Sequence, residues 1–553
     1  MFFISFLNYL IVFLFFLVIL YFYGRGIMLL INFLIYNSKN IPKNLLRTKT
    51  INLYPILGTL YIGNLLIITN YFLPLKSPYV YPILLVAFLP NFLKIEKINL
   101  NFDYEKILGY LIIPSILIIS IYNTGWHYDA GYYHLNHQHW LRESNMVIGM
   151  VNIHWAFGMS SISEYISSIL WINNSFVLLH FLNLSYIFCF YNILLNDLHE
   201  ENKVIQNGSL FLIIYSLLDN LGIYGGRNGF IFIEGVPKQD TTVAILFFLI
   251  ARSIFLILND KKIIKLEVTI LSLLVLFVIQ IKLSGVVLAL LIFLLYWFLI
   301  QKKGNSFSTL LYINIPSIVF SSFWIFKQYS TTGCFIYPVN FTCINSFNWY
   351  IKNSTESYEL ITRNSSYALS LYDFNFSKWS QEFLSFKINF GVTINSVGSL
   401  LLILLVSKVF YYNSSVSNKL KIILSAFLIL NLVYLIYYGP TPRYLMGYLI
   451  FSAYIIGLFS EDAKYFKLNR LTKNILILFS VILLIRSTSY VSMLNNNNIE
   501  LFDPRPIAEY VIQENGWLKP DLGDQCWIKL RCTMSTHKLI IDEDNFFKIA
   551  YRE

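Results

Sequence analysis

Apolar runs of about 16 to 22 residues recur along the whole chain and alternate with short polar segments. A helix of such a run can cross a hydrocarbon core of about 30 Å, and in lipid only a helix satisfies its own backbone groups. The runs lie near residues 2–23, 51–71, 79–94, 107–122, 175–195, 208–224, 241–258, 266–281, 283–300, 308–326, 388–408, 422–438, 445–459 and 474–490. They predict an all-α polytopic membrane protein with about 12–14 transmembrane helices.

The composition supports a membrane protein and excludes a soluble globular protein of this size. Hydrophobic residues make up 56% of the 553 residues and charged residues 13%, and the mean hydropathy is +0.60. The first run has no basic segment before it and no small-residue cleavage site, so we expect it to be a span and not a removed signal peptide. The net charge of +11 does not indicate a nucleic-acid partner, because the basic residues fall mostly in short loops between runs.

The basic short loops predict which side of the membrane each connection faces. If these loops are cytoplasmic, the long loops 123–174, 225–240 and 327–387 all face outward. The transmembrane domain then covers residues 1–490, and residues 491–553 form a small soluble tail on the same outer side. All candidate chemistry would share one compartment.

Four of the five cysteines fall in these outward segments. Cys334 and Cys343 are close in sequence, as are Cys526 and Cys532, whereas Cys189 lies inside an apolar run. An oxidising compartment favours the two short-range disulfides, Cys334 with Cys343 and Cys526 with Cys532, and the alternative is unpaired thiols.

The first outer loop carries the densest polar chemistry. It contains five of the eight histidines, which are His127, His134, His137, His139 and His154. Its segment 131–143 interleaves aromatic and polar residues, which is typical of an interfacial helix on the outer leaflet or of an ordinary amphipathic surface helix.

Asp129 follows the run that ends near Tyr122, at the expected water boundary, next to His127 and Tyr128. A carboxylate there can accept a proton from a substrate hydroxyl, and we expect partial desolvation to raise its pKa toward a useful range. The alternative is a solvated acid that caps the helix beginning at Ala130. The spacing does not decide between the two.

The loop 225–240 ends in a second acid. It supplies Arg227, Glu234 and Lys238 before Asp240, which directly precedes an apolar run. Asp240 is either the N-cap of that helix or an acid of the site.

Three cations also stand at the borders of apolar runs. Lys282 lies between two runs, where its ammonium either reaches the interface or pairs with a phosphate. Lys327 opens the polar turn KQYSTTGCFIYP, and Arg443 follows two prolines in the turn YYGPTPRYLMGY, which lies between two apolar runs. The planar guanidinium of Arg443 suits a phosphate or pyrophosphate, and the alternative is an interfacial anchor.

A metal site is a further alternative. His127 with Asp129, and His134 with His137 and His139, offer imidazole and carboxylate ligands. They match no tight zinc motif, so we name no metal ligand and no certain cofactor, and a divalent ion stays open.

The layout resembles the GT-C superfamily of membrane glycosyltransferases, in which many spans, a large first outer loop with an acid and a soluble C-terminal portion occur together. The chain also looks like an uncharacterised bacterial group of polytopic proteins. The resemblance is carried by DAGYYHLNHQHWL (129–141), VPKQDTTVAI (236–245), IKLS (281–284), TTGCFIYP (331–338), GPTPRYLMG (439–447) and GDQCWIKLRCT (523–533).

The resemblance implies transfer of a sugar from a polyprenyl-phosphate donor to a cell-envelope acceptor, on the periplasmic face of a bacterial inner membrane. The first-loop acid of that family, which is the base or the group that orients the acceptor, falls on Asp129. The chain departs from the family in lacking a DxD or ExD pair, because His127 and Tyr128 precede Asp129, and metal use is therefore in doubt.

The chemistry of such a transfer needs a base for the acceptor, which would be Asp129, and cations for the leaving phosphate. Arg443, with Lys282 or Lys327, would hold the phosphate. Asp240 and the histidines His127, His134 and His137 would help to bind substrate.

Three alternatives stay open. A lipid-linked-oligosaccharide flippase or another transporter would also place charges near spans. A polysaccharide polymerase or ligase would share the donor type and the compartment, and a structural membrane scaffold would need no activity.

Overall fold

The computed structural model describes residues 2–38, 40–94, 104–122, 124–171, 176–220, 238–260, 263–301, 306–344, 346–351, 354–409, 418–459, 468–485, 509–536 and 538–553. Each of the fourteen apolar runs overlaps a helix. These helices are α1 (Phe2–Tyr36), α2 (Tyr54–Asn70), α3 (Val80–Phe88), α5 (Ile113–Ile121), α8 (Leu178–Leu198), α9 (Lys203–Asn220), α10 (Asp240–Asp260), α11 (Lys265–Ile281), α12 (Leu288–Ile300), α13 (Phe307–Ile313) with α14 (Ile315–Thr332), α17 (Lys387–Val409), α18 (Asn418–Tyr438), α19 (Pro442–Leu458) and α20 (Arg470–Ile485).

Fewer helices than expected are long and apolar enough to cross a membrane. Within the described residues there are six, or eight if each of two bent helix pairs is one span. The six are Ile4–Tyr36, Tyr104–Ile121, Leu178–Leu198, Asp240–Asp260, Leu283–Ile300 and Asn418–Tyr438. The structure therefore confirms a mainly helical chain with several membrane-length helices. The count of 12–14 is higher because other apolar runs form shorter helices, such as Val80–Leu93 and Arg443–Leu458, or bend within the run.

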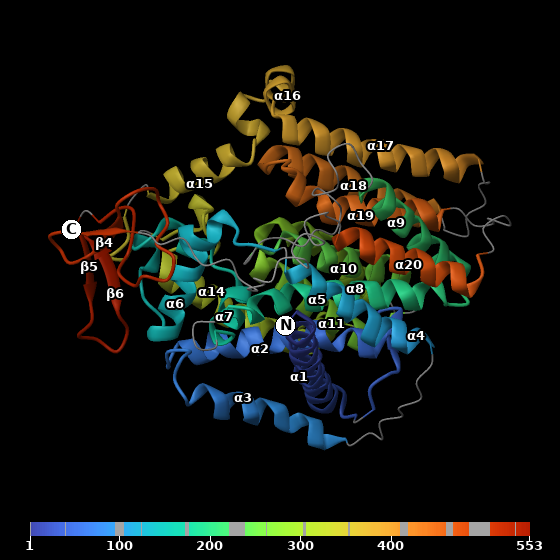
Figure 1. Cartoon of the computed structure of the whole chain (residues 1–553), viewed down its shortest axis with the longest axis horizontal. Helices are drawn as coiled ribbons and strands as arrows, with labels where there is room; N and C mark the ends of the chain where they lie inside the picture. Colours follow the sequence, from blue (N-terminus) through green and yellow to red (C-terminus); the bar gives the residue numbers. More distant parts are fainter. Residues whose placement is uncertain are drawn as a thin grey trace.

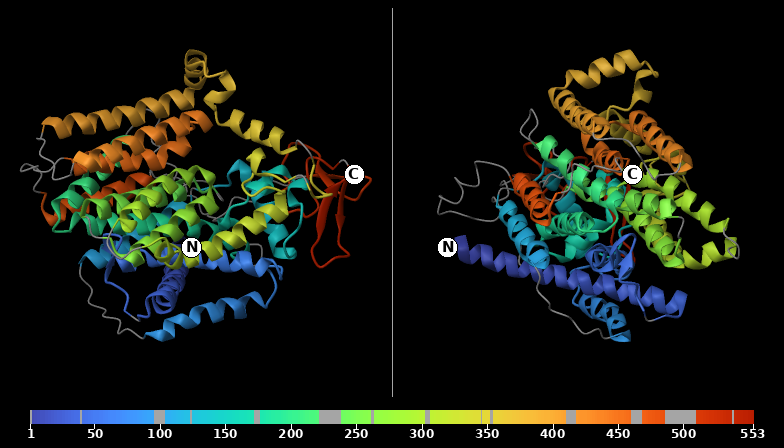
Figure 2. Two further views of the ribbon diagram at one scale, coloured as in Figure 1. Left: turned by 180° about the vertical axis from the view of Figure 1, so that it is seen from behind. Right: turned by 90° about the vertical axis from the view of Figure 1, so that its right-hand side faces the viewer.

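The helices form a bundle with α1 lying across it. Figure 1 shows α17, α18 and α20 running lengthwise, and the right-hand view of Figure 2 shows α1 at full length, crosswise to them. Helix α1 touches α2 at two glycines: a Cβ on Gly24 would lie 1.8 Å from the carbonyl oxygen of Tyr54, and one on Gly58 2.0 Å from that of Leu20. Only glycine allows two helix backbones to approach this closely.

Short helices and turns fill the connections between the long helices. They are η1 (Thr50–Asn52), η2 (Leu89–Leu93), α4 (Tyr104–Ile107), η3 (Leu108–Ile112), η4 (Ala130–His134), α6 (Leu135–Glu143), η5 (Met150–Asn152), η6 (Trp155–Met159), α7 (Ile162–Ile169), η7 (Leu283–Val287), η8 (Asn340–Thr342), α15 (Ser354–Ser365), η9 (Leu369–Tyr372) and α16 (Phe376–Ser385). Four of them, η4, α6, η6 and α7, form most of the first outer loop and position the polar residues described below.

The tail adds short β-strands to this mainly helical chain. Strands β3 (Tyr510–Ile512) and β4 (Leu518–Pro520) form one antiparallel pair, and β5 (Leu539–Asp542) and β6 (Ile549–Arg552) form another. A third pair, β1 (Asn44–Leu45) with β2 (Thr48–Lys49), lies near the N-terminus. The tail strands gather at one end of the long axis, next to α6 (Figure 1).

The tail packs on the first outer loop. The backbone N–H of Trp527 donates to the Gly131 carbonyl at 2.9 Å. The Ile148 N–H donates to the Lys548 carbonyl at 2.8 Å, and the Ile148 carbonyl accepts the Ala550 N–H at 2.9 Å. A small apolar cluster joins the two, and its buried members include Trp140, Phe157 and Trp517. Two segments about 400 residues apart in sequence thus build one layer, as expected if both lie on the same side of the helices.

Candidate functional site

The carboxylate of Asp129 lies against the start of α10. Its Oδ2 accepts a hydrogen bond from Lys238 Nζ at 2.7 Å. His127 Nδ1 lies 3.6 Å from the same oxygen and accepts the backbone N–H of Asp129 at 3.1 Å. No side-chain hydrogen bond from Asp129 caps η4, so its carboxylate belongs to an ion pair and not to a helix cap.

The pKa of Asp129 lies below its ordinary value, against the sequence-based expectation. Burial raises the pKa, but the Lys238 ammonium outweighs burial through its charge and its hydrogen bond, and the charges of His134 and His127 add to that effect. The expectation was wrong because it considered desolvation without the cation that the fold brings from the segment before α10. Burial, with the charge of Lys238, lowers the pKa of His127 to about 4. At neutral pH, Asp129 is therefore ionised and His127 is neutral.

A second ion pair lies beside the first. Asp240 is the first residue of α10 and is buried, and its Oδ1 accepts a hydrogen bond from Lys282 Nζ. Lys282 follows the last turn of α11, where the backbone becomes extended, and its ammonium lies 4.6 Å from the ring centre of Tyr444. The other oxygen of Asp240 is buried and has no hydrogen-bond partner among the described residues. Lys282 is therefore a paired cation of the site and not a bare ammonium.

Arg443 completes this cluster from the start of α19. Its guanidinium lies 5.1 Å from the ring centre of Tyr444, and Nη2 donates to the Tyr444 hydroxyl at 3.4 Å. The charges of Asp240 and Asp129 both act on Arg443. Within the described part of the chain, no carboxylate oxygen lies within 4.0 Å of the guanidinium. Arg443 is thus a solvent-exposed cation that no neighbouring acid neutralises by direct contact.

A buried acid, Glu164, joins two of the predicted histidines. It lies on α7, where Ser161 caps the helix, and both its side chain and that of His137 are 1% exposed. Glu164 Oε1 accepts a hydrogen bond from His134 Nδ1, and Oε2 contacts His137 Nδ1. Burial raises the pKa of Glu164, but the charges and hydrogen bonds of His137 and His134 bring it down to about 2.

Lys327 lies on α14 and is 2% exposed. It donates to the Ser160 hydroxyl and lies 4.7 Å and 5.7 Å from the ring centres of Trp324 and Tyr165. The charge of Glu164 acts on it. Lys327 is thus grouped with the buried acid and not with the ion pairs at α10.

The segment 131–143 does not lie exposed on a surface. Residues His137, Gln138 and Trp140 are all buried, and His139 Nδ1 is bonded to the Ile528 carbonyl at 2.5 Å. The tail covers this segment, so it is not a solvent-exposed surface helix. A Cβ on Gly131 would lie 2.6 Å from the Trp527 ring, so the chain needs glycine where the tail crosses.

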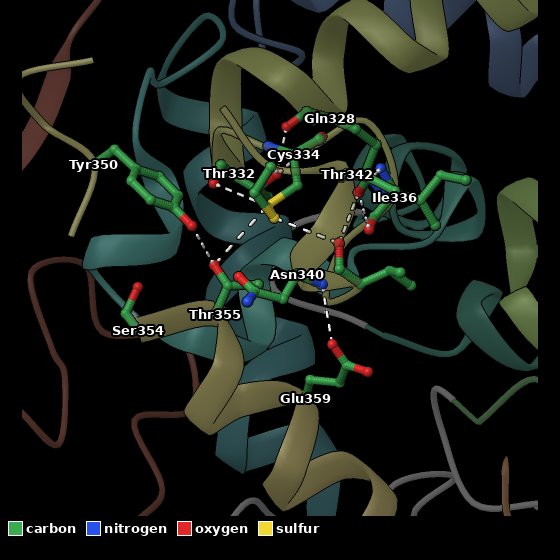
Figure 3. The surroundings of a disulfide bond; sticks show 12 residues. Gln328, Thr332, Cys334, Ile336, Asn340, Thr342, Tyr350, Ser354, Thr355 and Glu359 are labelled. Atoms are coloured by element: carbon green, nitrogen blue, oxygen red, sulfur yellow. Dashed lines mark hydrogen bonds between the residues drawn. A yellow bond between two sulfur atoms is a disulfide. The ribbon is translucent and has the colours of Figure 1, made fainter. Parts of the chain in front are cut away.

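Both expected cysteine pairs are joined as disulfides, Cys334 with Cys343 and Cys526 with Cys532, and Cys189 is a buried free thiol. The first disulfide closes the turn after α14. Figure 3 shows Thr332 and Thr355 beside it and Glu359, from α15, accepting the Asn340 N–H at 3.0 Å. The second disulfide lies in the part of the tail that crosses Gly131.

The fold thus brings together four residues singled out from far-apart segments: Asp129, Asp240, Lys282 and Arg443. His127 and His134 border this cluster, whereas His137 and Lys327 lie around Glu164. Arg227 and Glu234 fall outside the described residues.

Sequence reasoning missed Glu164 and Tyr444. Glu164 is the only charged residue in the stretch SSISEYISSILW, 160–171, and a lone acid in a stretch with no other charge indicates a buried partner. Tyr444 gave no such signal, because tyrosines are common throughout this chain.

No group of three or more His, Cys, Asp or Glu side chains in the described residues is arranged to hold a metal ion. Of the imidazoles considered as ligands, His134 and His137 both turn Nδ1 toward Glu164.

A family described as a domain of unknown function (DUF8201) matches the chain over residues 7–450. This range contains Asp129, Lys238, Asp240, Lys282 and Arg443, and it ends before the tail. No curated protein and no solved structure matches the chain.

Proposed function

The chain belongs to the DUF8201 family, and we propose that it is a membrane glycosyltransferase that moves a sugar from a polyprenyl-phosphate donor to a cell-envelope acceptor. The observation that carries the proposal is the cluster at the start of α10 and α19. It holds three cations, Lys238, Lys282 and Arg443, against two carboxylates, Asp129 and Asp240. The surplus positive charge lies on Arg443.

The guanidinium of Arg443 has no carboxylate in direct contact and lies beside the ion pairs of Asp129 with Lys238 and of Asp240 with Lys282. Such a guanidinium suits a phosphate ligand. Arginine offers paired N–H donors that match two phosphate oxygens, and a phosphate would supply the negative charge that the cluster lacks. Lys282 lies on the same ring of Tyr444 as Arg443 does, so it would be the second cation within reach of the leaving group.

Asp129 is suited to bind the hydroxyl group of the acceptor. Because the Lys238 pair keeps it ionised, its carboxylate can accept the hydrogen bond of an acceptor hydroxyl and aim the oxygen at the sugar. In the reaction, the acceptor O–H bond breaks and its proton passes to a base, the acceptor oxygen bonds to the anomeric carbon, and the bond from that carbon to the phosphate oxygen breaks. The phosphate leaves with the electron pair, and Arg443 stabilises its charge.

The helices suit a lipid-linked donor. Six to eight of them are long and apolar enough to cross a membrane, so the polyprenyl chain would stay in lipid while its phosphate reaches the cluster. We propose that the site faces the periplasm at a bacterial inner membrane, because the topology predicted from the basic loops puts the long loops and both cysteine pairs on the outer side.

The test is transfer from radiolabelled polyprenyl-phosphate sugars by the purified protein in lipid discs. We expect Asp129→Asn to reduce turnover by at least about 10²-fold, since the neutral amide cannot replace the carboxylate. A lane with chelator decides whether a divalent ion takes part. If the wild-type protein transfers nothing and instead moves lipid-linked sugar across the bilayer, the proposal is wrong and the protein is a flippase.

A further inference from the structure

The first outer loop contains a carboxylate and histidine pair that the proposed reaction has not yet used. Glu164 lies on α7 and His134 at the junction of η4 and α6, and their side chains are 1% and 8% exposed. A buried carboxylate is costly unless its oxygens receive hydrogen bonds. Here both oxygens face imidazole nitrogens, and the one contact with hydrogen-bond geometry is that of His134 Nδ1.

This contact fixes the tautomer of His134. An ionised carboxylate only accepts hydrogen bonds, so Nδ1 of His134 must carry the hydrogen that it donates to Glu164. In the neutral imidazole the other nitrogen, Nε2, then has a free lone pair and is directed away from Glu164. A carboxylate that holds a histidine in this way both orients the ring and stabilises the imidazolium that forms when Nε2 takes a proton.

His134 also lies at the site and not apart from it. Its charge acts on both Asp129 and His127, and Tyr133, the residue before it, feels the charges of Asp129, Glu164 and Arg443. His137, in contrast, packs against Phe157 with ring centres 5.2 Å apart and is 1% exposed. Of the two histidines on Glu164, only His134 borders the cluster.

The groups already at the cluster are poor proton acceptors. Asp129 is held by the Lys238 ammonium at 2.7 Å, which favours its ionised form and weakens it as a base. His127 uses Nδ1 to accept the Asp129 backbone N–H. A group that binds the acceptor hydroxyl is thus present, but the proton that leaves that hydroxyl still needs a destination.

We propose that His134, oriented by Glu164, is the general base that takes the acceptor's proton, and that Asp129 holds the acceptor in place. The inference rests on the proposed function. In the step, the acceptor O–H bond breaks and its proton goes to His134 Nε2, and the freed electron pair forms the bond to the anomeric carbon. The bond from that carbon to the phosphate oxygen breaks, and the phosphate leaves as an anion. His134 then returns its proton to water. Glu164 does not touch the substrate and acts as a positioning residue.

The experiment compares His134→Gln, Glu164→Gln and the double variant with the wild-type protein in lipid discs, by kcat and KM for the donor. We expect each single variant to lower kcat by about 10²-fold or more, with KM for the donor within a few-fold of wild type, because the phosphate contacts of Arg443 remain. The double variant should be no worse than the poorer single variant, since the two residues act as one unit. His199→Gln, which removes a histidine bonded to Asn474, is the matched control and should keep wild-type kcat.

Binding of the polyprenyl phosphate, measured by thermal shift, separates a lost chemical step from a misfolded variant. Variants that bind the lipid as the wild type does but no longer turn over support the inference. If the wild type transfers sugar and His134→Gln keeps its kcat within a few-fold, His134 is not the base and only this inference is overturned. Additive losses in the double variant also overturn it. Absence of transfer by the wild type would instead overturn the proposed function.

Discussion

Two charge clusters that include residues of α10 differ in how completely their charges are neutralised. In the helix core, Arg252 of α10 and Asp197 of α8 are 0% and 1% exposed. Two guanidinium nitrogens reach the two carboxylate oxygens at 3.0 and 2.7 Å, and Ser209 donates to the same carboxylate at 2.8 Å. Arg252 also donates to the carbonyls of Leu46 and Arg47.

At the other end of α10, the cluster with Asp129 and Asp240 is less complete. It has one more cation than carboxylates, and Asp240 Oδ2 is buried without a partner in the described structure. A closed network of equal charges joins helices, whereas a cluster with surplus charge and open polar atoms has room for a ligand. The comparison supports a structural role for Arg252 and agrees with the binding role proposed for Arg443.

The largest effect on stability should come from breaking the ion pair between Asp197 and Arg252. Asp197→Asn leaves Arg252 buried without its counter-charge and should lower the free energy of unfolding by about 3–5 kcal/mol. A thiol-reactive dye can follow unfolding in detergent, because Cys189 is the buried free cysteine. Glu201→Gln, at an exposed position, is the control and should leave Tm unchanged. A Tm for Asp197→Asn equal to wild type would remove the structural role.

Arg443→Lys, unlike Asp197→Asn, should change Tm little and should greatly reduce turnover. A point charge replaces the planar fork, and we expect kcat/KM for the donor to fall about 10²-fold, which equals about 2.7 kcal/mol. Arg470→Lys is the matched control, because Arg470 pairs with Glu105 away from the cluster. Near-normal turnover by Arg443→Lys would mean that Arg443 is only an interfacial anchor.

Removing the disulfide between Cys526 and Cys532 should loosen the tail and leave the helix bundle intact. Closing so short a loop stabilises the folded form by about 2 kcal/mol in the chain-entropy account. In the variant with both cysteines changed to serine, we expect amide exchange to rise in residues 509–536 and to stay unchanged in α8 and α10. Unchanged exchange in the tail would show that its contacts with the first outer loop suffice.

Lys238→Met tests the electrostatics of the acceptor group. In the wild-type protein the pKa of Asp129 is lowered because Lys238 outweighs burial. Without that cation only the raising effect of burial is large, so Asp129 should bind a proton at higher pH. The proposed transfer requires the ionised form of Asp129, and the acid limb of the pH profile should therefore move to higher pH.

Lys76→Met is the control for loss of a positive charge, because Lys76 pairs with Glu143 on an exposed surface. Its pH profile should match that of the wild type. An acid limb in Lys238→Met that stays where it is in the wild type would show that Asp129 does not control it.

Much of the architecture follows from local sequence. Runs of apolar residues dictate helices wherever they occur, because each helix satisfies its own backbone, and all fourteen expected runs overlap helices. The cysteine pairs Cys334 with Cys343 and Cys526 with Cys532 followed from short spacing. Residue type and position at the ends of runs also singled out Asp129, Asp240, Lys282 and Arg443.

Only the tertiary structure decided how these residues are paired and which of them is left unpaired. The Lys238 ammonium reaches Asp129 across 109 residues, and Glu164 meets His134 across 30. Such contacts depend on how helices pack and where the tail closes over the first outer loop, and no local pattern encodes them. Since electrostatic energy depends on distance in space, the same fold also reversed the expected pKa shift of Asp129.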